Sequence, residues 1–196
     1  MSELTLVIGN KNYSSWSLRP WFFMKHHQMD FAEKRIPLFT KMTTQQLSPY
    51  NSDLKVPVLL DGDLTVWDTL SIMEYLSETC LDGRGWPAEV SARALARSIS
   101  AEMHSSFTHI RNELPMNCRR QFNHIQLSPE GLKEAQRIQQ LWHLCRSRYA
   151  QNGPWLFGEL TIADAMFAPV VLRFNGYAVA LDSEAKGYVE TVLNHP

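Results

Sequence analysis

Cysteine is scarce in this sequence. Only Cys80, Cys118 and Cys145 occur among 196 residues, and no two of them form a C-x-x-C pair. An odd number of widely spaced thiols suggests neither a disulfide framework nor a zinc knuckle. A dithiol redox centre needs one cysteine to attack and a second to resolve. We therefore expect reduced thiols in a cytoplasm, no metal site and no dithiol redox chemistry.

Long runs of basic or apolar residues are also missing. The net charge is −1 and no cluster of Lys or Arg stands out, so the composition does not predict a basic surface that would bind nucleic-acid phosphates. No apolar stretch approaches the length of a membrane span, and residues 1–10 lack the basic and apolar regions of a signal peptide. We expect a cytoplasmic protein that binds neither nucleic acid nor membrane.

Aromatic residues, in contrast, are plentiful. The chain has six Trp, nine Phe and six Tyr, and 44% of its residues are hydrophobic. Each aromatic side chain buries a large area, so this composition predicts a folded protein with a sizeable core.

The first eighty residues alternate strand and helix patterns, in the order β-α-β-α-β-β-α. The Asp-Gly turn at 61–63 predicts a hairpin between two of the strands. The clearest segments are strands at 4–8, 32–39, 56–60 and 64–66, and helices at 17–27 and 69–79.

The glycine- and proline-containing segment 81–88 predicts a domain boundary, because the pattern after it is helical throughout. We expect an α/β domain at 1–80, a linker at 81–88 and an all-helical domain at 89–196. The expected helices run from Leu95 to Leu114 as one long helix, from Pro129 to near Asn152, from Thr161 toward Asn175, and from Ser183 to Leu193. Thr161 and Asp164 have the spacing of a capping box.

Several polar side chains stand between the first strand and the first helix, where open α/β units place ligands. Ser14, Ser15 and Ser17 can each cap the helix, and capping alone would explain one or more of them. Pro20 fits best in a first helical turn, which favours Ser17 as the cap and leaves Ser14 for function.

Two further short motifs have structural explanations of their own. Val56-Pro57 precedes a strand, and most X-Pro bonds are trans. Asp68-Thr69 precedes a helix, where a carboxylate and a hydroxyl can serve as caps.

Taken together and in order, these motifs resemble the N-terminal domain of the glutathione transferases, and segment 156–164 resembles a capped helix of their C-terminal domain. The motifs are Tyr13-Ser14-Ser15 with Arg19, then Lys55-Val56-Pro57-Val58, then Asp68-Thr69-Leu70-Ser71-Ile72 before Glu74-Tyr75-Leu76. The similarity is greatest to the serine-type classes, zeta and tau. It implies a thioredoxin-like domain followed by an all-helical domain.

The resemblance also implies roles for individual residues. Ser14 matches the serine whose hydroxyl donates to the glutathione sulfur, and the neighbouring Ser15 is also expected to bind glutathione. Val56 matches the residue whose backbone pairs with the cysteinyl part of glutathione, which makes Pro57 cis. Asp68 and Thr69 match the residues that hold the γ-glutamyl group. Lys41 and Lys55 match residues that bind the glycyl carboxylate.

We expect Tyr13 and Trp16 to contact the electrophilic substrate and so to determine which substrate is accepted. His104 and Arg111 lie near an apolar helical stripe without belonging to it, and they could contribute as well. If these two side chains are simply solvated, they have no such role. Arg111 would steer an acidic substrate. Trp16 stands where the zeta class has its cysteine, so reduction through mixed disulfides has no nucleophile here.

The resemblance therefore implies a glutathione transferase that attacks a small electrophile, with glutathione as co-substrate, a role in detoxification and a homodimeric state. Glutathione-dependent isomerisation, dehalogenation and peroxide reduction stay open. So does a noncatalytic member that binds glutathione or a protein partner. The family also implies one more helix after His195-Pro196, where this sequence stops.

Overall fold

The chain divides into two compact units. The computed structural model describes residues 3–50, 52–122 and 125–196, and the two units are Met1–Gly85 and Trp86–Pro196. The division between Gly85 and Trp86 falls inside the segment 81–88 that the composition marked as a linker. Each unit is described by itself.

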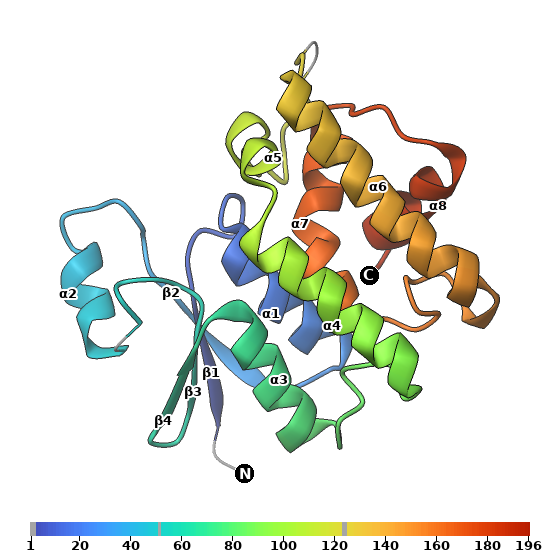
Figure 1. The fold of residues 1–196 in the computed structure, drawn as a ribbon. Helices are drawn as coiled ribbons and strands as arrows, with labels where there is room; N and C mark the ends of the chain where they lie inside the picture. The colour runs from blue at the N-terminus through green and yellow to red at the C-terminus, as the bar shows by residue number, and fades with distance from the viewer. Residues whose placement is uncertain (1–2, 51, 123–124) are drawn as a thin grey trace. The chain divides into compact units, whose positions relative to one another are not determined.

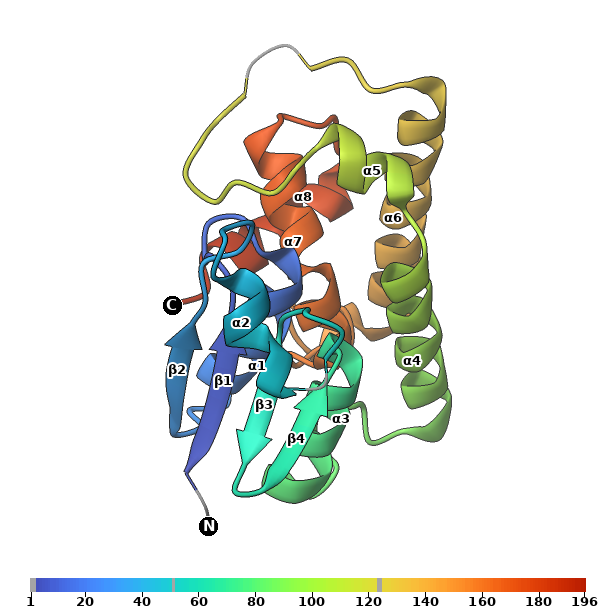
Figure 2. The ribbon, with the colours of Figure 1, turned by 90° about the vertical axis from the view of Figure 1, so that its left-hand side faces the viewer.

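The first unit is a four-stranded mixed sheet with helices on both faces (Figures 1 and 2). Its elements are β1 (Leu4–Ile8), α1 (Ser15–His26), β2 (Phe31–Arg35), α2 (Thr43–Leu47), a 3-10 turn (Ser48–Tyr50), β3 (Val58–Asp61), β4 (Leu64–Trp67) and α3 (Thr69–Cys80). The strand order is β2-β1-β3-β4, with β1 and β2 parallel and the other pairs antiparallel. The predicted order of strands and helices is confirmed.

The alternation of side chains along β1 explains the two layers of packing. Val7 is fully buried with Val58, Leu47 and Tyr50, on the face that α2 and the following turn cover. Leu6 on the opposite face is also fully buried, because successive strand residues point to opposite sides. Figure 2 shows α2 in front of the sheet and α1 and α3 behind it.

The second unit is all helical. Its elements are α4 (Val90–Ser105), α5 (Thr108–Glu113), α6 (Pro129–Tyr149), a 3-10 turn (Ala150–Asn152), α7 (Ile162–Gly176) and α8 (Ser183–Leu193). Helix α7 is buried on nearly every side, and α4 and α8 pack against it. A helix that is apolar all round belongs at the centre of a core. The predicted fold class, an α/β unit followed by an all-helical unit, is confirmed.

The prediction of one continuous helix from Leu95 to Leu114 is wrong. The chain breaks between α4 and α5, where Phe107 adopts the left-handed conformation with φ 64° and ψ 44°. The Arg111 guanidinium stabilises the break, because its Nε donates to the carbonyl of Ser106 at 3.0 Å and an Nη donates to that of Met103. The apolar stripe continues across the break since Phe107 is itself buried. Such a stripe reports which residues are buried and not whether the backbone is continuous.

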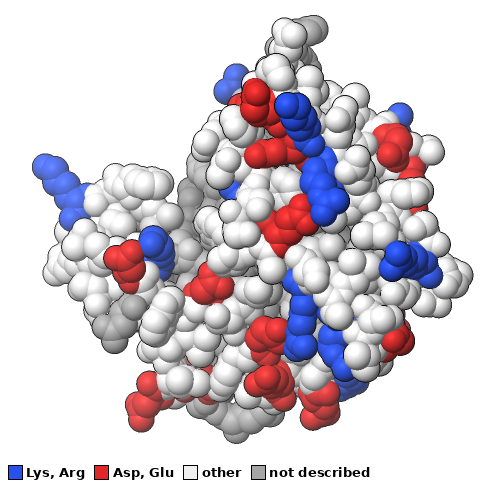
Figure 3. Space-filling model, in the orientation of Figure 1, with Lys and Arg blue, Asp and Glu red and all other residues white. Residues whose placement is uncertain are grey.

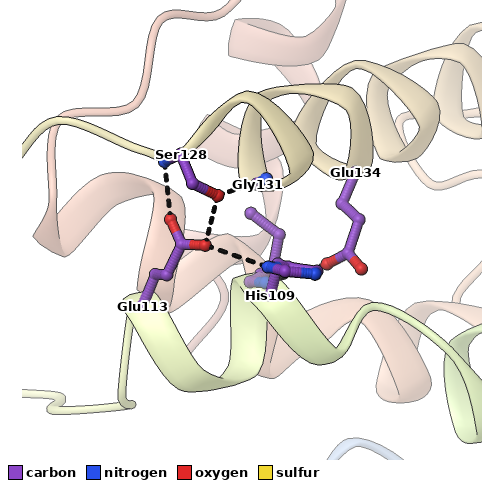
Figure 4. A network of polar contacts seen from close by, with 6 residues as sticks. His109, Glu113, Ser128, Gly131 and Glu134 are labelled. Carbon is purple, nitrogen blue, oxygen red and sulfur yellow. Dashed lines mark hydrogen bonds and ion pairs between the residues drawn. The ribbon is translucent and has the colours of Figure 1, made fainter.

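A carboxylate on α5 caps the start of α6 (Figure 4). Glu113 accepts from the backbone N–H of Ser128 at 2.8 Å and from its hydroxyl at 2.6 Å, while the Ser128 Oγ accepts from the N–H of Gly131 at 3.0 Å. These bonds to Ser128 hold the pKa of the Glu113 carboxyl below its usual range. A side chain at position 131 would meet this carboxylate, because a Cβ there would lie 2.7 Å from its Oε2.

Acidic and basic side chains mix on the outer surface of α4 and α6 (Figure 3). Arg137 on α6 binds Glu102 on α4 through two bonds of 2.8 and 2.9 Å. No helix of the described residues combines the length and apolar character that crossing a membrane requires.

Candidate functional site

Ser14 is the N-cap of α1, which corrects the prediction that Ser17 caps this helix. The Ser14 Oγ accepts from the backbone N–H of Ser17 at 3.3 Å, and α1 begins at Ser15. The Ser14 side chain is half-buried, whereas Ser15 and Ser17 are buried. Ser14 therefore both caps the helix and keeps a partly exposed hydroxyl at the helix N-terminus.

Ser17 has a different role, as the centre of a short hydrogen-bond chain. Its Oγ accepts from the N–H of Gly9 at 3.0 Å and from the Ser14 hydroxyl at 2.9 Å. Gly9 permits this close approach, because a Cβ there would lie 2.8 Å from Leu38 and 3.2 Å from the Cβ of Ser14. The end of β1 thus fixes the position of Ser14 through Ser17. Sequence reasoning missed this contribution, although two serines three residues apart at a helix start are a signal for it.

The misplaced cap has a clear cause in Pro20. A proline is easily accommodated in the first turn, where the missing N–H has no helical partner. Here Pro20 is the sixth residue of α1, so the helix contains a missing donor in its second turn. The prediction treated Pro20 as a start signal and shifted the helix by two residues.

The loop before β3 lies at the same end of the sheet. The Val56–Pro57 peptide bond is cis, and β3 starts after it, at Val58. The register pairs Val7, near the end of β1, with Val58, the first residue of β3, so the cis-proline loop lies at the end of the sheet where β1 leads toward Ser14.

Asp68 comes next to this loop. Trp67, the last residue of β4, pairs with Val58, the first residue of β3, and Asp68 follows Trp67 directly in the chain. The Asp68 carboxylate caps α3, since its Oδ1 accepts from the N–H groups of Leu70 at 2.9 Å and Ser71 at 3.4 Å. Its backbone has φ 72° and ψ 136°, a strained conformation for a residue other than glycine, and such conformations concentrate at functional sites.

Thr69 is buried at the start of α3, and its expected contact with glutathione stays a prediction. It is 1% exposed, and its hydroxyl donates to the backbone carbonyl of Trp16 at 3.0 Å. This bond joins the first turns of α1 and α3. Ser14, Val56 and Asp68 therefore gather at one end of the first unit, with Thr69 buried between the two helices.

The remaining predicted residues of the first unit are more exposed. The Lys55 ammonium pairs with the exposed Asp53 at 2.7 Å, and Lys41 is exposed just before α2. Tyr13 is 59% exposed. The Trp16 ring is half-buried and stacks against the guanidinium of the buried Arg19, 4.4 Å from its centroid.

His104 and Arg111 belong to the second unit. His104 lies in the last turn of α4 and is half-buried. Burial lowers the pKa of Arg111, although the nearby Glu134 carboxylate opposes this change. The carbonyl contacts of Arg111 give it a structural role, and its part in substrate binding stays a prediction, as does that of His104. Among the described residues, no group of three or more His, Cys, Asp or Glu is arranged to hold a metal ion.

Comparison with known proteins gives the same family for the first unit. Residues 13–79, which include most of the predicted site, match the family described as "Glutathione S-transferase, N-terminal domain". The chain is 36% identical over 58 residues to a dichloromethane dehalogenase of Methylophilus leisingeri, which covers 29% of this chain and 22% of the relative. It is 30% identical over 98 residues to a probable maleylacetoacetate isomerase of Caenorhabditis elegans, which covers 50% of this chain and 45% of the relative. The chain thus spans less than half the length of these curated relatives.

Solved structures extend the comparison to the whole chain. A glutathione transferase homologue from Burkholderia, with bound glutathione, superposes with a TM-score of 0.73 over 100% of this chain and 93% of its own, at 22% identity. At this identity the likeness establishes the fold. Residues 13–79 thus match the N-terminal domain family of the glutathione S-transferases, and the fold of the chain is similar to that of solved glutathione transferases along its full length.

Proposed function

We propose that this protein is a glutathione transferase in which the Ser14 hydroxyl donates a hydrogen bond to the thiolate of bound glutathione. The observation that carries this proposal is the position of Ser14, half-buried at the N-terminus of α1 and held there by Ser17. The proximity of the cis-proline loop and Asp68 in the strand register supports it. The thiolate would attack a small electrophile.

The free energy needed to ionise the glutathione thiol is within the range that a hydrogen bond and a helix N-terminus can supply. A free thiol has a pKa of about 8.5, and lowering it by ~2 units requires about 2.7 kcal/mol of preference for the thiolate. A hydrogen bond to a charged group contributes about 1.5–3 kcal/mol. The N-terminus of a helix adds about 0.3–1 kcal/mol for a nearby anion. Ser14 and α1 together would supply the whole shift.

Donation to the sulfur requires the Ser14 proton to leave its present acceptor, the Ser17 Oγ. A neutral hydroxyl is a weaker acceptor than a thiolate, so the proton turns toward the sulfur when glutathione binds. The Ser14 Oγ keeps its bond from the Ser17 N–H during this rotation. The helix cap and the thiolate contact are therefore compatible.

The other parts of glutathione would bind along the same end of the sheet. Val56 would pair its backbone with the cysteinyl group, and Asp68 would bind the γ-glutamyl amine. Lys41 and Lys55 would bind the glycyl carboxylate, for which Lys55 must leave Asp53. That exposed ion pair is weak enough to exchange.

Removal of the Ser14 hydroxyl tests the mechanism. We expect glutathione bound to the wild type to show a thiol pKa well below that of free glutathione, measured by ultraviolet titration of the thiolate. In Ser14→Ala the pKa should return toward the free value, and kcat/KM at neutral pH should fall about 10- to 100-fold, because a charged hydrogen bond is lost.

Ser128→Ala is the matched control for the capping role. Ser128 is the N-cap of α6 and also accepts from a backbone N–H, that of Gly131. Each of the two variants should lose about 1 kcal/mol of stability from its missing cap, but only Ser14→Ala should change the thiol pKa. If glutathione binds with an unshifted thiol, or does not bind, the noncatalytic reading replaces the transferase.

The names of the relatives guide the choice of electrophiles. A thiolate displaces halide from an alkyl halide, and it adds reversibly to a conjugated double bond. The assay should therefore include a dihalomethane, a maleyl-substituted keto acid, a peroxide and an aromatic halide. We propose a substrate within these classes because the dehalogenase and the isomerase are each similar to part of this chain, and because residues 13–79 match the family's N-terminal domain.

We also propose a cytoplasmic homodimer with a role in detoxification. None of Cys80, Cys118 and Cys145 forms a disulfide bond, which supports a reducing compartment. Burial raises the pKa of the Cys145 thiol to about 12, so this cysteine stays protonated. Sedimentation equilibrium of the purified chain should give twice the monomer mass, and a monomer at micromolar concentration would refute the dimer.

A further inference from the structure

The hydroxyls of Ser14 and Ser17 can exchange their hydrogen-bonding roles. Their oxygens lie 2.9 Å apart, and in this structure Ser14 donates while Ser17 accepts. An oxygen–oxygen distance of this length suits either hydroxyl as the donor, because each carries one proton on a rotatable bond. The direction of the bond therefore depends on the other partners of the two oxygens.

The fold fixes one partner of the Ser17 oxygen. The backbone N–H of Gly9, the residue after β1, donates to it at 3.0 Å in a buried bond. Ser17 is only 3% exposed, whereas Ser14 is half-buried. A ligand at the start of α1 would therefore meet the Ser14 hydroxyl, and Ser17 would act on that ligand through Ser14.

A thiolate beside Ser14 would favour the opposite direction of the bond. When the Ser14 proton turns toward the sulfur, the Ser17 oxygen no longer accepts it. The Ser17 hydroxyl can then donate to the Ser14 Oγ, which still accepts from the Ser17 N–H. Two accepted bonds and one donated bond are what a hydroxyl oxygen can make, so the Ser14 hydroxyl would be fully satisfied.

The reversed bond would align three donors toward the sulfur. The Gly9 N–H would donate to Ser17, the Ser17 hydroxyl to Ser14, and the Ser14 hydroxyl to the thiolate. Donors in such a chain polarise one another and strengthen each bond by roughly 10–30%. In the direction that this structure shows, the bonds from Gly9 and Ser14 both end at Ser17.

We infer that Ser17 is a positioning residue that polarises the Ser14 hydroxyl, and that the bond between them reverses when glutathione binds. No proton passes from one oxygen to the other, because both hydroxyls rotate and each keeps its own hydrogen. This role deepens the proposed function and rests on it, since the reversal requires a thiolate as the acceptor for Ser14.

Ser17→Ala tests this role through the thiol of bound glutathione. We expect the pKa of that thiol, measured by ultraviolet titration of the complex, to be about 0.5 higher than in the wild type, because Ser14 loses its polarising donor. Below this pKa, kcat/KM should fall about threefold, and above it the two enzymes should converge. In a Ser14→Ala background, Ser17→Ala should raise the pKa no further.

Two variants separate polarisation from the loss of a buried bond. Ser77→Ala is the matched control, because the Ser77 Oγ also accepts a buried bond of 3.0 Å from a glycine N–H eight residues away, that of Gly85. It should lower the urea midpoint about as much as Ser17→Ala and leave the thiol pKa unchanged. Ser17→Thr keeps the hydroxyl and should keep the thiol pKa of the wild type.

The backbone amide of Gly9 provides a second measurement that needs no substitution. Because its N–H begins the chain of donors, its proton resonance should move downfield as the bound thiol ionises, with the same midpoint pH. The complex with S-methylglutathione, which has no thiol to ionise, should show no such change with pH.

The outcomes separate this role from the proposed function. An unchanged thiol pKa in Ser17→Ala, or a Gly9 resonance that does not follow the ionisation, overturns the role of Ser17 and leaves the transferase proposal standing. An equal rise with and without Ser14 would mean that Ser17 acts on the sulfur directly, which overturns it as well. If the thiol bound to the wild type is unshifted, both proposals fail.

Discussion

Asp164→Asn is expected to lower the free energy of unfolding by about 3–5 kcal/mol, measured by urea denaturation at pH 7. Asp164 is fully buried at the start of α7, where it and Thr161 form a capping box. Its Oδ1 accepts from the Leu156 N–H at 3.0 Å and the Tyr188 hydroxyl at 3.2 Å. Its Oδ2 accepts from the N–H and the hydroxyl of Thr161 at 2.8 and 3.0 Å.

The size of this effect follows from the number of donors around one carboxylate. An amide has a single acceptor oxygen, and its NH₂ group would face donors instead of acceptors. One backbone N–H would then be buried without a partner, one hydroxyl would have to turn from donor to acceptor, and the remaining bonds would no longer be made to a charged group, at about 1–3 kcal/mol each. The matched control is Tyr188→Phe, which removes one donor together with its bond and should reduce stability by only about 1 kcal/mol. Equal losses in the two variants would contradict this account.

The same carboxylate should make stability depend on pH. Burial raises the pKa of Asp164 from 3.8 to about 6, although its four hydrogen bonds oppose the rise. The folded protein therefore binds this proton more tightly than the unfolded chain, so the contribution of the group is greatest below pH 4 and decreases as the pH rises through about 6. The difference in stability between wild type and Asp164→Asn should narrow from pH 4.5 to pH 7, and a difference that widens would refute this sign.

Trp142→Ala should lower the free energy of unfolding by about 3–5 kcal/mol. Trp142 is fully buried on α6 and contacts three aromatic rings, those of Phe167, Phe174 and Tyr188, with centroid distances of 6.1, 5.6 and 5.0 Å. These rings come from α7 and α8, so Trp142 joins the three helices of this core. Its removal leaves a cavity that rigid helices fill only partly.

Trp142→Phe serves as the comparison for the cavity. No described residue accepts a hydrogen bond from the Trp142 Nε1, so phenylalanine removes a buried polar group that has no protein partner. Removing this group is favourable and offsets part of the stability lost with the smaller side chain. We therefore expect the free energy of unfolding to fall by less than about 1.5 kcal/mol, measured by urea denaturation. A loss as large as that of Trp142→Ala would show that the indole N–H has a partner, such as a buried water.

The order of elements in the first unit was predictable because each segment carries a local pattern. The strand at Leu4–Ile8 and the hairpin around Gly62 are encoded by short apolar runs and an Asp-Gly turn. The break at Phe107 was not predictable in this way. A left-handed phenylalanine is unfavourable in isolation and depends on burial of its ring and on Arg111.

The candidate site was also predictable only in part, where local patterns in the sequence decide the structure. Ser14 and Asp68 were recognisable because a hydroxyl or carboxylate at a helix start has a limited set of roles. The cap itself was misassigned to Ser17, because Pro20 was expected in the first turn of the helix and is its sixth residue. No local pattern contains the bond between Thr69 and Trp16, which joins residues 53 positions apart.

The two-part architecture, the family resemblance and the residue types at the site follow from the sequence alone, because they depend on periodicity, turn residues and short motifs. The folded chain was needed to establish which serine caps α1, that Thr69 faces a backbone carbonyl, and that Arg111 closes the end of α4. The physical reason is that a buried hydrogen-bonding group takes whichever partner the packing brings within reach. That partner can lie anywhere along the chain.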